Sequence, residues 1–294
     1  MTGTQEPLAE RDMTRRRALI AGGAVVAAAG IGAAAVTSAA ADEDTGATAA
    51  TDARAEECYQ LTSTYTEGPY YIDADKIRAD ITEDREGIPM TLKLKVIDSV
   101  TCEPLRFACV DIWHCDAGGV YSGYEDAGSG DGGGGTPPPT DAPTGAPTGS
   151  PPPGGGGGHQ EPTDDERYLR GTQLTDKKGF VTFKTIFPGW YQGRALHIHT
   201  KVHVDGEMTD SGYEGGTTCH TGQFFFDEVA AVESEKVEPY ASNTATRTTL
   251  TEDGIYDQSG VQGGLLKLKY APGHIARGVT GSITMGVDPD AVES

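Results

Sequence analysis

Short segments in which apolar and polar residues alternate recur along this chain, and they restrict the folds open to it. The alternation is clear in residues 90–98 and 108–116, and similar segments follow at 180–187, 196–204, 222–226 and 281–287. Successive side chains of a β-strand point to opposite faces, so this period indicates strands with one buried face. Turn residues separate the segments, and only residues 227–237 carry a short helical pattern. The chain is therefore predicted to be all-β, a β-sandwich of mostly antiparallel strands with long loops.

Residues 126–166 interrupt this pattern with Gly, Pro, Thr, Ser and Asp almost throughout, including five consecutive glycines at 154–158. Such a composition cannot bury a core, so a disordered Gly/Pro-rich loop insertion is predicted rather than a domain boundary. The insertion is tolerable because the entropy of loop closure grows only logarithmically with length. It is either a neutral expansion or a cover over the mouth of a nearby site.

The first 41 residues are predicted to be an export signal. Arginines at 15–17 precede an apolar Ala/Gly-rich run that reaches about Val36, and the small residues 37–41 follow it. Consecutive arginines are typical of the twin-arginine pathway, so the protein is predicted to be secreted by that route. After cleavage no stable membrane anchor would remain. Residues 42–55 are predicted to be a flexible linker, and residues 56–290 one domain.

The net charge and the cysteines limit the partners and the covalent links. The chain carries a formal net charge of −21, and such an acidic surface repels phosphate backbones, which argues against nucleic-acid binding. The five cysteines can form at most two disulfides within one chain. Cys58, Cys102 and Cys219 are the predicted bridge candidates, while Cys109 is predicted to be a small core residue. The pairing and the oligomeric state stay open at this point.

Two histidines in one predicted strand point to a metal site. His197 and His199 are two residues apart in the segment 196–204, so their side chains approach an ion from one face. His203 continues the same alternation, and three tyrosines lie upstream, at Tyr121, Tyr124 and Tyr191. A phenolate is a hard anionic ligand that suits ferric iron. A strand with histidines on a solvated face is the alternative, and the tyrosines favour an iron enzyme over it.

Several motifs, taken together and in this order, resemble the intradiol ring-cleavage dioxygenases, the family of catechol and protocatechuate dioxygenases. The resemblance is closest to its secreted, single-chain branch and covers roughly residues 56–290 without the insertion. Each motif alone is weakly specific. They are Thr66–Tyr71, Asp111–Ala117, Gly119–Tyr124, Leu169–Gly171, Phe187–Arg194, His197–His199 and Thr221–Phe226.

The resemblance implies a cofactor, a reaction and a set of ligands. The family holds non-haem Fe(III) with two tyrosinates and two histidines, and the matching positions are Tyr121, Tyr191, His197 and His199. The implied reaction cleaves a catechol-type aromatic between its two hydroxylated carbons with O₂ and gives a muconate-type diacid. The implied partners are therefore a small catechol and O₂, in the catabolism of aromatic compounds.

The resemblance also implies roles for neighbouring residues. Tyr191 matches the tyrosine that leaves the metal and takes a substrate proton. Arg194 matches the guanidinium that stabilises charge on the substrate, and Gln223 matches an amide lining the same pocket. The insertion after Tyr124 departs from the family pattern, so substrate specificity is not carried over. The alternative function is a secreted β-sandwich binding module with a structural metal, which binds carbohydrate or an aromatic polymer.

Overall fold

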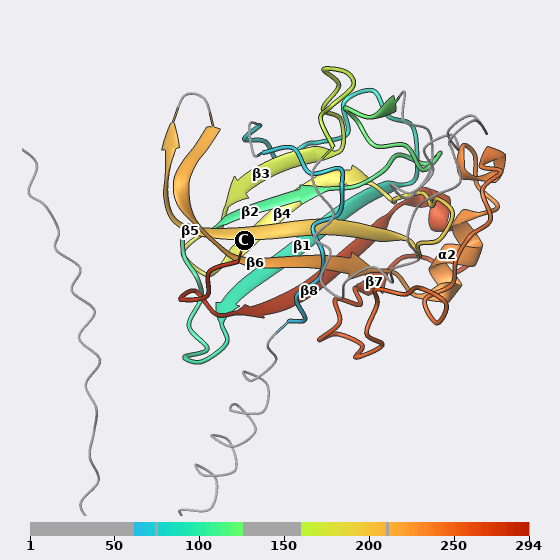
Figure 1. Cartoon of the computed structure of the whole chain (residues 1–294). Coiled ribbons are helices and arrows are strands. Elements are labelled where there is room, and N and C mark those ends of the chain that lie inside the picture. Colours follow the sequence, from blue (N-terminus) through green and yellow to red (C-terminus); the bar gives the residue numbers. More distant parts are fainter. Residues whose placement is uncertain (1–61, 74–75, 126–159, 210–211, 294) are drawn as a thin grey trace, which may run out of the picture. The chain divides into compact units, whose positions relative to one another are not determined.

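The computed structural model describes residues 62–73, 76–125, 160–209 and 212–293, which form two four-stranded sheets (Figure 1). Sheet A has the strand order β4-β1-β8-β7, and sheet B has the order β3-β2-β5-β6. The strands are β1 Pro89–Asp98, β2 Cys109–Trp113, β3 Arg170–Leu174, β4 Phe180–Ile186, β5 His197–Thr209, β6 Gly212–Phe225, β7 Lys267–Lys269 and β8 Val279–Val287.

Most neighbouring strands run antiparallel. The exception is β1, which pairs with β8 in parallel while it pairs with β4 antiparallel. In sheet B, β2 pairs antiparallel with both β3 and β5, and β5 pairs antiparallel with β6. The predicted fold class, a mostly antiparallel all-β sandwich, is confirmed.

One hydrophobic core lies between the two sheets. Sheet A contributes alternate residues such as Leu92, Leu94 and Phe183, and sheet B contributes residues such as Ile112 and Ile198, all fully buried. Burying one such side chain is worth about 1.5–3 kcal/mol, so this layer supplies most of the driving force for folding. The alternation that indicated strands in the sequence is thus the pattern that fills the core.

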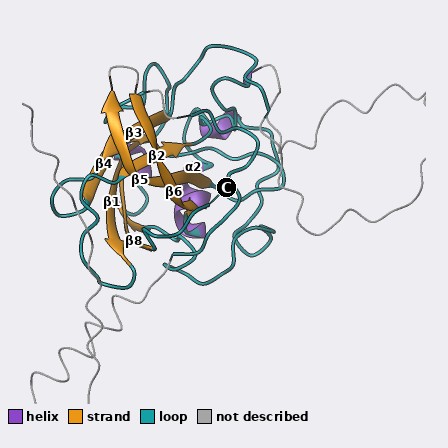
Figure 2. Ribbon diagram, turned by 60° about the vertical axis from the view of Figure 1, so that its left-hand side comes forward, coloured by secondary structure: helices purple, strands orange, loops and turns teal. Residues whose placement is uncertain are grey.

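The outer face of sheet B is also covered, although by loops instead of a third sheet. All five residues of β2 are buried, including those on the face turned away from the core. Figure 2 shows the strands gathered on one side and long loops on the other, together with the short helices. These are α2, Glu228–Ser234, and the 3₁₀ turns η2, Tyr240–Ser242, and η3, Ile275–Arg277. Loops that cover a polar sheet face create an enclosed polar site.

The structure corrects several strand boundaries. The strand predicted at 108–116 runs only from Cys109 to Trp113, because the chain leaves the sheet there and turns at Asp116–Gly119. The predicted strand 196–204 extends to Thr209 and pairs with β6, which begins at Gly212 instead of Gly222. A β-bulge adds one residue to β6, since Val202 pairs with His220 and His203 with Thr218. Strands β3 and β7 were not predicted.

The cysteine prediction is partly wrong. Cys102 is disulfide-bonded, while Cys219 is free and buried beside the core, so it is not a bridge residue. Cys109 and Cys115 are also free and buried, and the prediction of Cys109 as a core residue agrees with its complete burial. Cys58 lies outside the described residues.

Some predicted segments cannot be compared with the structure. The predicted signal at 1–41, the linker at 42–55 and residues 126–159 of the predicted insertion lie outside the described residues. Residues 160–166 of that insertion are loop, and Gln160 donates its backbone N–H to Pro69 O. In the described part of the chain, no helix is long and apolar enough to cross a membrane.

Candidate active site

Strand β5 places His197 and His199 on the outer face of sheet B, where both are buried. In the sheet register His199 lies between Trp113 of β2 and Gln223 of β6. The Trp113 indole stacks on the His199 ring, with centroids 4.9 Å apart and an interplanar angle of 9°. The backbone at Gly68 also lies against the His199 ring, because a Cβ at Gly68 would be 3.2 Å from His199 Cε1. The imidazole is therefore held on two sides.

Two loops carry Tyr121 and Tyr191 toward these histidines. They interlock through glycines: a Cβ on Gly119 would lie 2.3 Å from Trp190 O, and one on Gly189 would lie 2.4 Å from Asp116 O. No side chain fits at either position, and Gly119 also has a positive φ of +86°. The two glycines therefore let the tyrosine-bearing segments approach within backbone contact.

Four side-chain donor atoms converge at the end of these segments, and we call them the donor cluster: Tyr121 Oη, Tyr191 Oη, His197 Nε2 and His199 Nε2. His197 Nε2 lies 3.3 Å from Tyr121 Oη, 3.2 Å from Tyr191 Oη and 3.0 Å from His199 Nε2. All four residues are buried. The structure thus brings together the four ligand candidates that the sequence singled out from three separate segments.

Hydrogen bonding alone does not account for this convergence. His197 Nδ1 lies 2.7 Å from Ala195 O, and because a carbonyl only accepts, Nδ1 carries the proton. His197 Nε2 then has one lone pair in the ring plane, yet three polar atoms crowd around it. A cation shared by all four donors resolves the conflict, and a ring proton donated to a carbonyl is the usual support of a metal-binding histidine.

The spacing of the donors fits a metal ion. Nitrogen and oxygen ligands of zinc, for comparison, lie about 2.0–2.2 Å from the ion, so neighbouring ligands at angles between 90° and 109° are about 2.8–3.6 Å apart. The three measured separations fall within this range. Within the described residues, no group of three or more His, Cys, Asp or Glu side chains could hold a metal ion, so the tyrosines are required.

Burial sets the protonation states of the donor cluster. It lowers the pKa of His199 well below the usual value, and the neighbouring His197 and Arg194 lower it further. The pKa of His197 is lowered for the same main reason. Burial, followed by the nearby Tyr191, raises the pKa of Tyr121 well above its usual value. The imidazoles are therefore neutral, as metal binding requires, while the Tyr121 phenol needs a cation to ionise.

A buried network holds Arg194 next to the donor cluster. Arg194 Nε donates to Asp253 Oδ2 at 3.0 Å, and the two side chains are 5% and 0% exposed. Arg194 Nη2 donates to Gln223 Oε1, and Gln223 Nε2 donates to Thr66 O at 2.9 Å. Both predicted pocket residues, Arg194 and Gln223, are thus fixed in orientation. The positive charge of Arg194 also lowers the pKa of both histidines.

Asp253 was not among the residues predicted from the sequence, although both of its carboxylate oxygens accept hydrogen bonds in the structure. Its Oδ2 accepts from Arg194 Nε and from the backbone of Ala195, and its Oδ1 accepts from the backbone of Ile255 and Tyr256. Asp253 is separated from Arg194 by 59 residues, so no local spacing indicates the pair. Only the folded chain brings them together.

Arg170 braces the loop that carries Tyr121. This buried guanidinium donates from Nε to Ser122 Oγ at 2.9 Å, and from Nη2 to Ser122 O at 2.7 Å. Its Nη1 donates to Tyr70 O at 2.7 Å, and the Tyr70 ring stacks on Tyr121 with centroids 4.8 Å apart. Arg170 therefore ties strand β3 to the two segments that enclose the Tyr121 ring.

Other residues considered in the sequence lie away from the donor cluster. Tyr124, the alternative to Tyr121, donates its hydroxyl to Gln160 O at 2.8 Å. His114 is bonded to Thr185 Oγ1 at 2.7 Å, and His203 to Thr218 Oγ1 at 3.1 Å. His203 lies on the same strand face as His197, but farther along it. These contacts leave Tyr121 as the tyrosine directed at the histidines.

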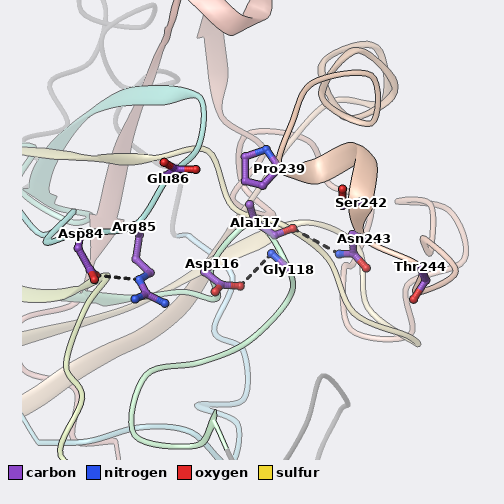
Figure 3. A pocket seen from close by; sticks show the side chains of 10 residues that line it. All are labelled: Asp84, Arg85, Glu86, Asp116, Ala117, Gly118, Pro239, Ser242, Asn243 and Thr244. Carbon is purple, nitrogen blue, oxygen red and sulfur yellow. Dashed lines mark hydrogen bonds and ion pairs between the residues drawn. The ribbon is translucent and has the colours of Figure 1, made fainter.

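A polar pocket of about 490 Å³ lies beside the turn that leads to Tyr121 (Figure 3). Asp116 accepts from Gly118 N there, and Asn243 Nδ2 donates to Ala117 O and Trp190 O. None of the four donors lines this pocket. Asn243 thus links the loop that carries Tyr121 to the loop that carries Tyr191. The pocket itself is separate from the donor cluster.

Comparison with known proteins gives the family. No protein-family model matches this chain, and no curated protein does. Among solved structures, an intradiol ring-cleavage dioxygenase from Tetranychus urticae is 30% identical with a TM-score of 0.61, over 80% of this chain and 97% of that one. The structure of dioxygenase Tetur07g02040 gives the same values. Hydroxyquinol 1,2-dioxygenase from Pseudomonas putida DLL-E4 is more distant, with 15% identity and a TM-score of 0.47 over 84% of this chain and 71% of that one.

The chain belongs to the intradiol ring-cleavage dioxygenases. The resemblance found in the sequence motifs is thereby confirmed, and so is the enzyme class, an intradiol ring-cleaving dioxygenase. This membership favours the enzyme over the alternative of a β-sandwich binding module.

Proposed function

We propose that this protein is an exported Fe(III)-dependent dioxygenase that cleaves a catechol-type aromatic between its hydroxylated carbons with O₂, giving a muconate-type diacid. The observation that carries the proposal is the convergence of the donor cluster, in which three polar atoms lie within 3.3 Å of His197 Nε2, a nitrogen with a single lone pair. Two phenolates and two neutral imidazoles form a donor set that suits a hard trivalent cation.

Tyr121, Tyr191, His197 and His199 would hold the iron. A ferric ion held there would supply the Lewis-acid and redox chemistry that activates a catechol ring toward O₂. The protein supplies the geometry: His197 is oriented by Ala195 O, and the His199 ring is held between Trp113 and Gly68. The other residues manage protons and charge.

Tyr191 is the proposed base. Its hydroxyl oxygen lies 3.2 Å from His197 Nε2, within the donor cluster. As a phenolate, Tyr191 would accept a substrate proton at Oη, which is general base catalysis. Tyr121 keeps its place during this exchange because Tyr70 stacks on its ring and Arg170 braces its loop.

Arg194 and Gln223 are the proposed electrostatic pair. Asp253 holds the Arg194 guanidinium from one side, and Gln223 accepts from its Nη2 on the other. Negative charge that develops on the substrate would therefore meet a cation that does not have to reorganise. In a buried site such a preorganised cation acts much more strongly than in water.

An oxygen-electrode assay with catechol, protocatechuate, hydroxyquinol and chlorinated catechols tests the proposal. The iron-loaded protein should consume O₂ with at least one of them and should show visible tyrosinate-to-iron absorption. Tyr191→Phe should remove much of this absorption and slow turnover, whereas Tyr124→Phe, the matched control outside the donor cluster, should leave both unchanged. A colourless protein that binds zinc in preference to iron would contradict the proposal.

Arg194→Ala separates the electrostatic role from metal binding. Its turnover should fall much more than its iron content, because Arg194 contacts none of the four donors by a hydrogen bond in the described structure. Equal losses of iron and turnover would show that Arg194 acts on the metal site instead.

The proposed export rests on the first 41 residues. The arginines at 15–17, the apolar run and the small residues after it are the supporting features. Replacing Arg16 and Arg17 with lysine should retain the protein inside the cell, as detected by fractionation. Unchanged secretion of that variant would exclude the twin-arginine route.

A further inference from the structure

Lysines gather on the outer face of sheet A, although the chain as a whole is strongly acidic. The chain has ten lysines and a net charge of −21. The alternation of the strands turns half of these lysines outward on this one face, at Lys93, Lys95, Lys184, Lys267 and Lys269. In the sheet register Lys93 lies opposite Ser282, which lies opposite Lys267, so the charges belong to one surface.

Within the described part of the chain, the strands of this face carry almost no compensating acid. The four strands of sheet A contain a single acidic residue, Asp98, whose side chain accepts from the backbone of the following turn. Lys184 forms an ion pair with Asp80 at 2.7 Å. Among the described residues, no ion pair forms at the other four lysines. The strands of sheet A therefore carry a net positive charge in a chain that is otherwise strongly negative.

The same face is hollowed into a groove of about 700 Å³. Lys93, Lys95 and Lys267 line it, together with the apolar side chains of Phe180, Val261 and Leu265. Phe180 and Val261 are 46% and 47% exposed, which is high for large apolar residues. The Lys95 ammonium lies 5.8 Å from the centroid of the Phe180 ring, so cationic and apolar groups adjoin here. A surface that combines cations without acidic partners and exposed apolar groups fits a ligand with both properties.

We propose that this groove binds a polymer that carries carboxylates on apolar, ring-containing units. The lysines would contact the carboxylates, and Phe180, Val261 and Leu265 would contact the rings. A fully hydrophilic polyanion would leave the apolar side chains without a partner. A lipid surface is flat and would reach the rim of a groove but not its floor.

The lysines of the groove are on the outer face of sheet A, whereas the donor cluster is on the outer face of sheet B; of the apolar lining residues, Leu265 also packs against Phe225 of β6. A polymer held in the groove would leave the donor cluster accessible. The inference therefore does not depend on the proposed ring cleavage, and the two can fail separately.

Binding to poly(4-vinylbenzoate), a polymer with a carboxylate on each ring, tests this inference by titration calorimetry at 0.1 M salt. The Debye length is then about 10 Å, so the local patch dominates over the net charge of the protein. Lys93→Glu/Lys267→Glu should weaken binding about tenfold or more. The matched control Lys76→Glu/Lys236→Glu makes the same change of charge away from this face and should weaken binding less than about twofold.

A second pair of variants tests the apolar half of the groove. Phe180→Ala should weaken binding of poly(4-vinylbenzoate) by several fold, whereas Phe107→Ala, at a residue 60% exposed but outside the groove, should not. Binding of polyacrylate, which lacks rings, should be several fold weaker than that of the aromatic polymer. Thermal unfolding of all four variants should match that of the wild type.

Three results would overturn the inference. The first is no binding of poly(4-vinylbenzoate) by the wild-type protein, and the second is equal weakening by the groove pair and the control pair. The third is tighter binding to vesicles of phosphatidylglycerol than to the polymer, which would assign the face to a lipid surface. Oxygen uptake with a small catechol, measured on the same samples, reports the ring-cleaving function independently.

Discussion

Replacing Asp253 with asparagine removes the charge that holds Arg194 while nearly preserving side-chain shape. Both carboxylate oxygens accept two hydrogen bonds each, from Arg194 Nε, Ala195 N, Ile255 N and Tyr256 N. An asparagine amide nitrogen would face two of these donors in either orientation. The variant therefore loses the ion pair and also places donors against donors.

The magnitude follows from the burial of the pair. Arg194 and Asp253 are 5% and 0% exposed, and removing one partner of such a buried pair costs about 3–5 kcal/mol. Removal of one preorganised charge-stabilising donor from an enzyme lowers kcat by about 10²–10³-fold, which is the upper bound if Arg194 loses its orientation completely. We expect Asp253→Asn to lower kcat between about tenfold and that bound, with iron content retained.

Urea unfolding, iron analysis and steady-state oxygen uptake on the same preparation measure these effects. Glu252→Gln is the matched control, because it makes the same change of charge at a fully exposed neighbour and should cost less than about 1 kcal/mol. Asp253→Glu keeps the charge and should recover part of kcat. If Asp253→Asn lost stability but kept its wild-type kcat, the idea that Asp253 positions Arg194 for catalysis would be refuted.

Three further predictions concern the donor cluster. Gly119→Ala places a Cβ 2.3 Å from Trp190 O at positive φ, so it should lower the free energy of unfolding in urea by about 2–4 kcal/mol and lower the iron content. Gly193→Ala, also at positive φ but with no atom within 4 Å, should keep its iron. Equal iron loss in both variants would contradict the close-approach explanation. Tyr121→Phe should weaken iron binding by equilibrium dialysis while Tyr124→Phe should not, and a larger effect of Tyr124→Phe would reverse the assignment. Since burial raises the pKa of Tyr121 and lowers the pKa of His199, iron loading should release protons from phenol and not from imidazole. Iron affinity should therefore rise with pH above neutrality. Calorimetry in buffers of different ionisation enthalpy measures the proton release, and no release would exclude a phenolate ligand.

The sequence predicts the parts of this protein that depend on local periodicity. Strands β1, β4 and β5 follow the alternation that fills the core, and the spacing of His197 and His199 places both on one face of β5. Both properties depend on residues two apart in the chain. For the same reason the outward direction of Lys93 and Lys95 follows from the alternation of β1 once its buried face is known.

Features that depend on distant contacts could not be predicted in this way. Strand β3 has the sequence RGTQL, with a glycine and few β-branched residues, and it forms because β2 pairs along its whole length. Cys219 lies at the bulge of β6 and is buried beside the core, although its neighbours in the sequence are polar. Asp253 is recognisable only through its contact with Arg194.

The way the fold supports its donors restricts how Tyr191 can act as a base. His199 lies where β5 pairs with both β2 and β6, and His197, two residues away, pairs with Phe225 of β6, so the sheet fixes the positions of both histidines. Tyr121 and Tyr191 lie on loops, but these loops are interlocked at backbone contact through Gly119. A movement of the Tyr191 backbone would displace the Tyr121 segment as well. If Tyr191 withdraws while Tyr121 stays, as we propose, Tyr191 must therefore move by rotation of its side chain, and the loops remain in place.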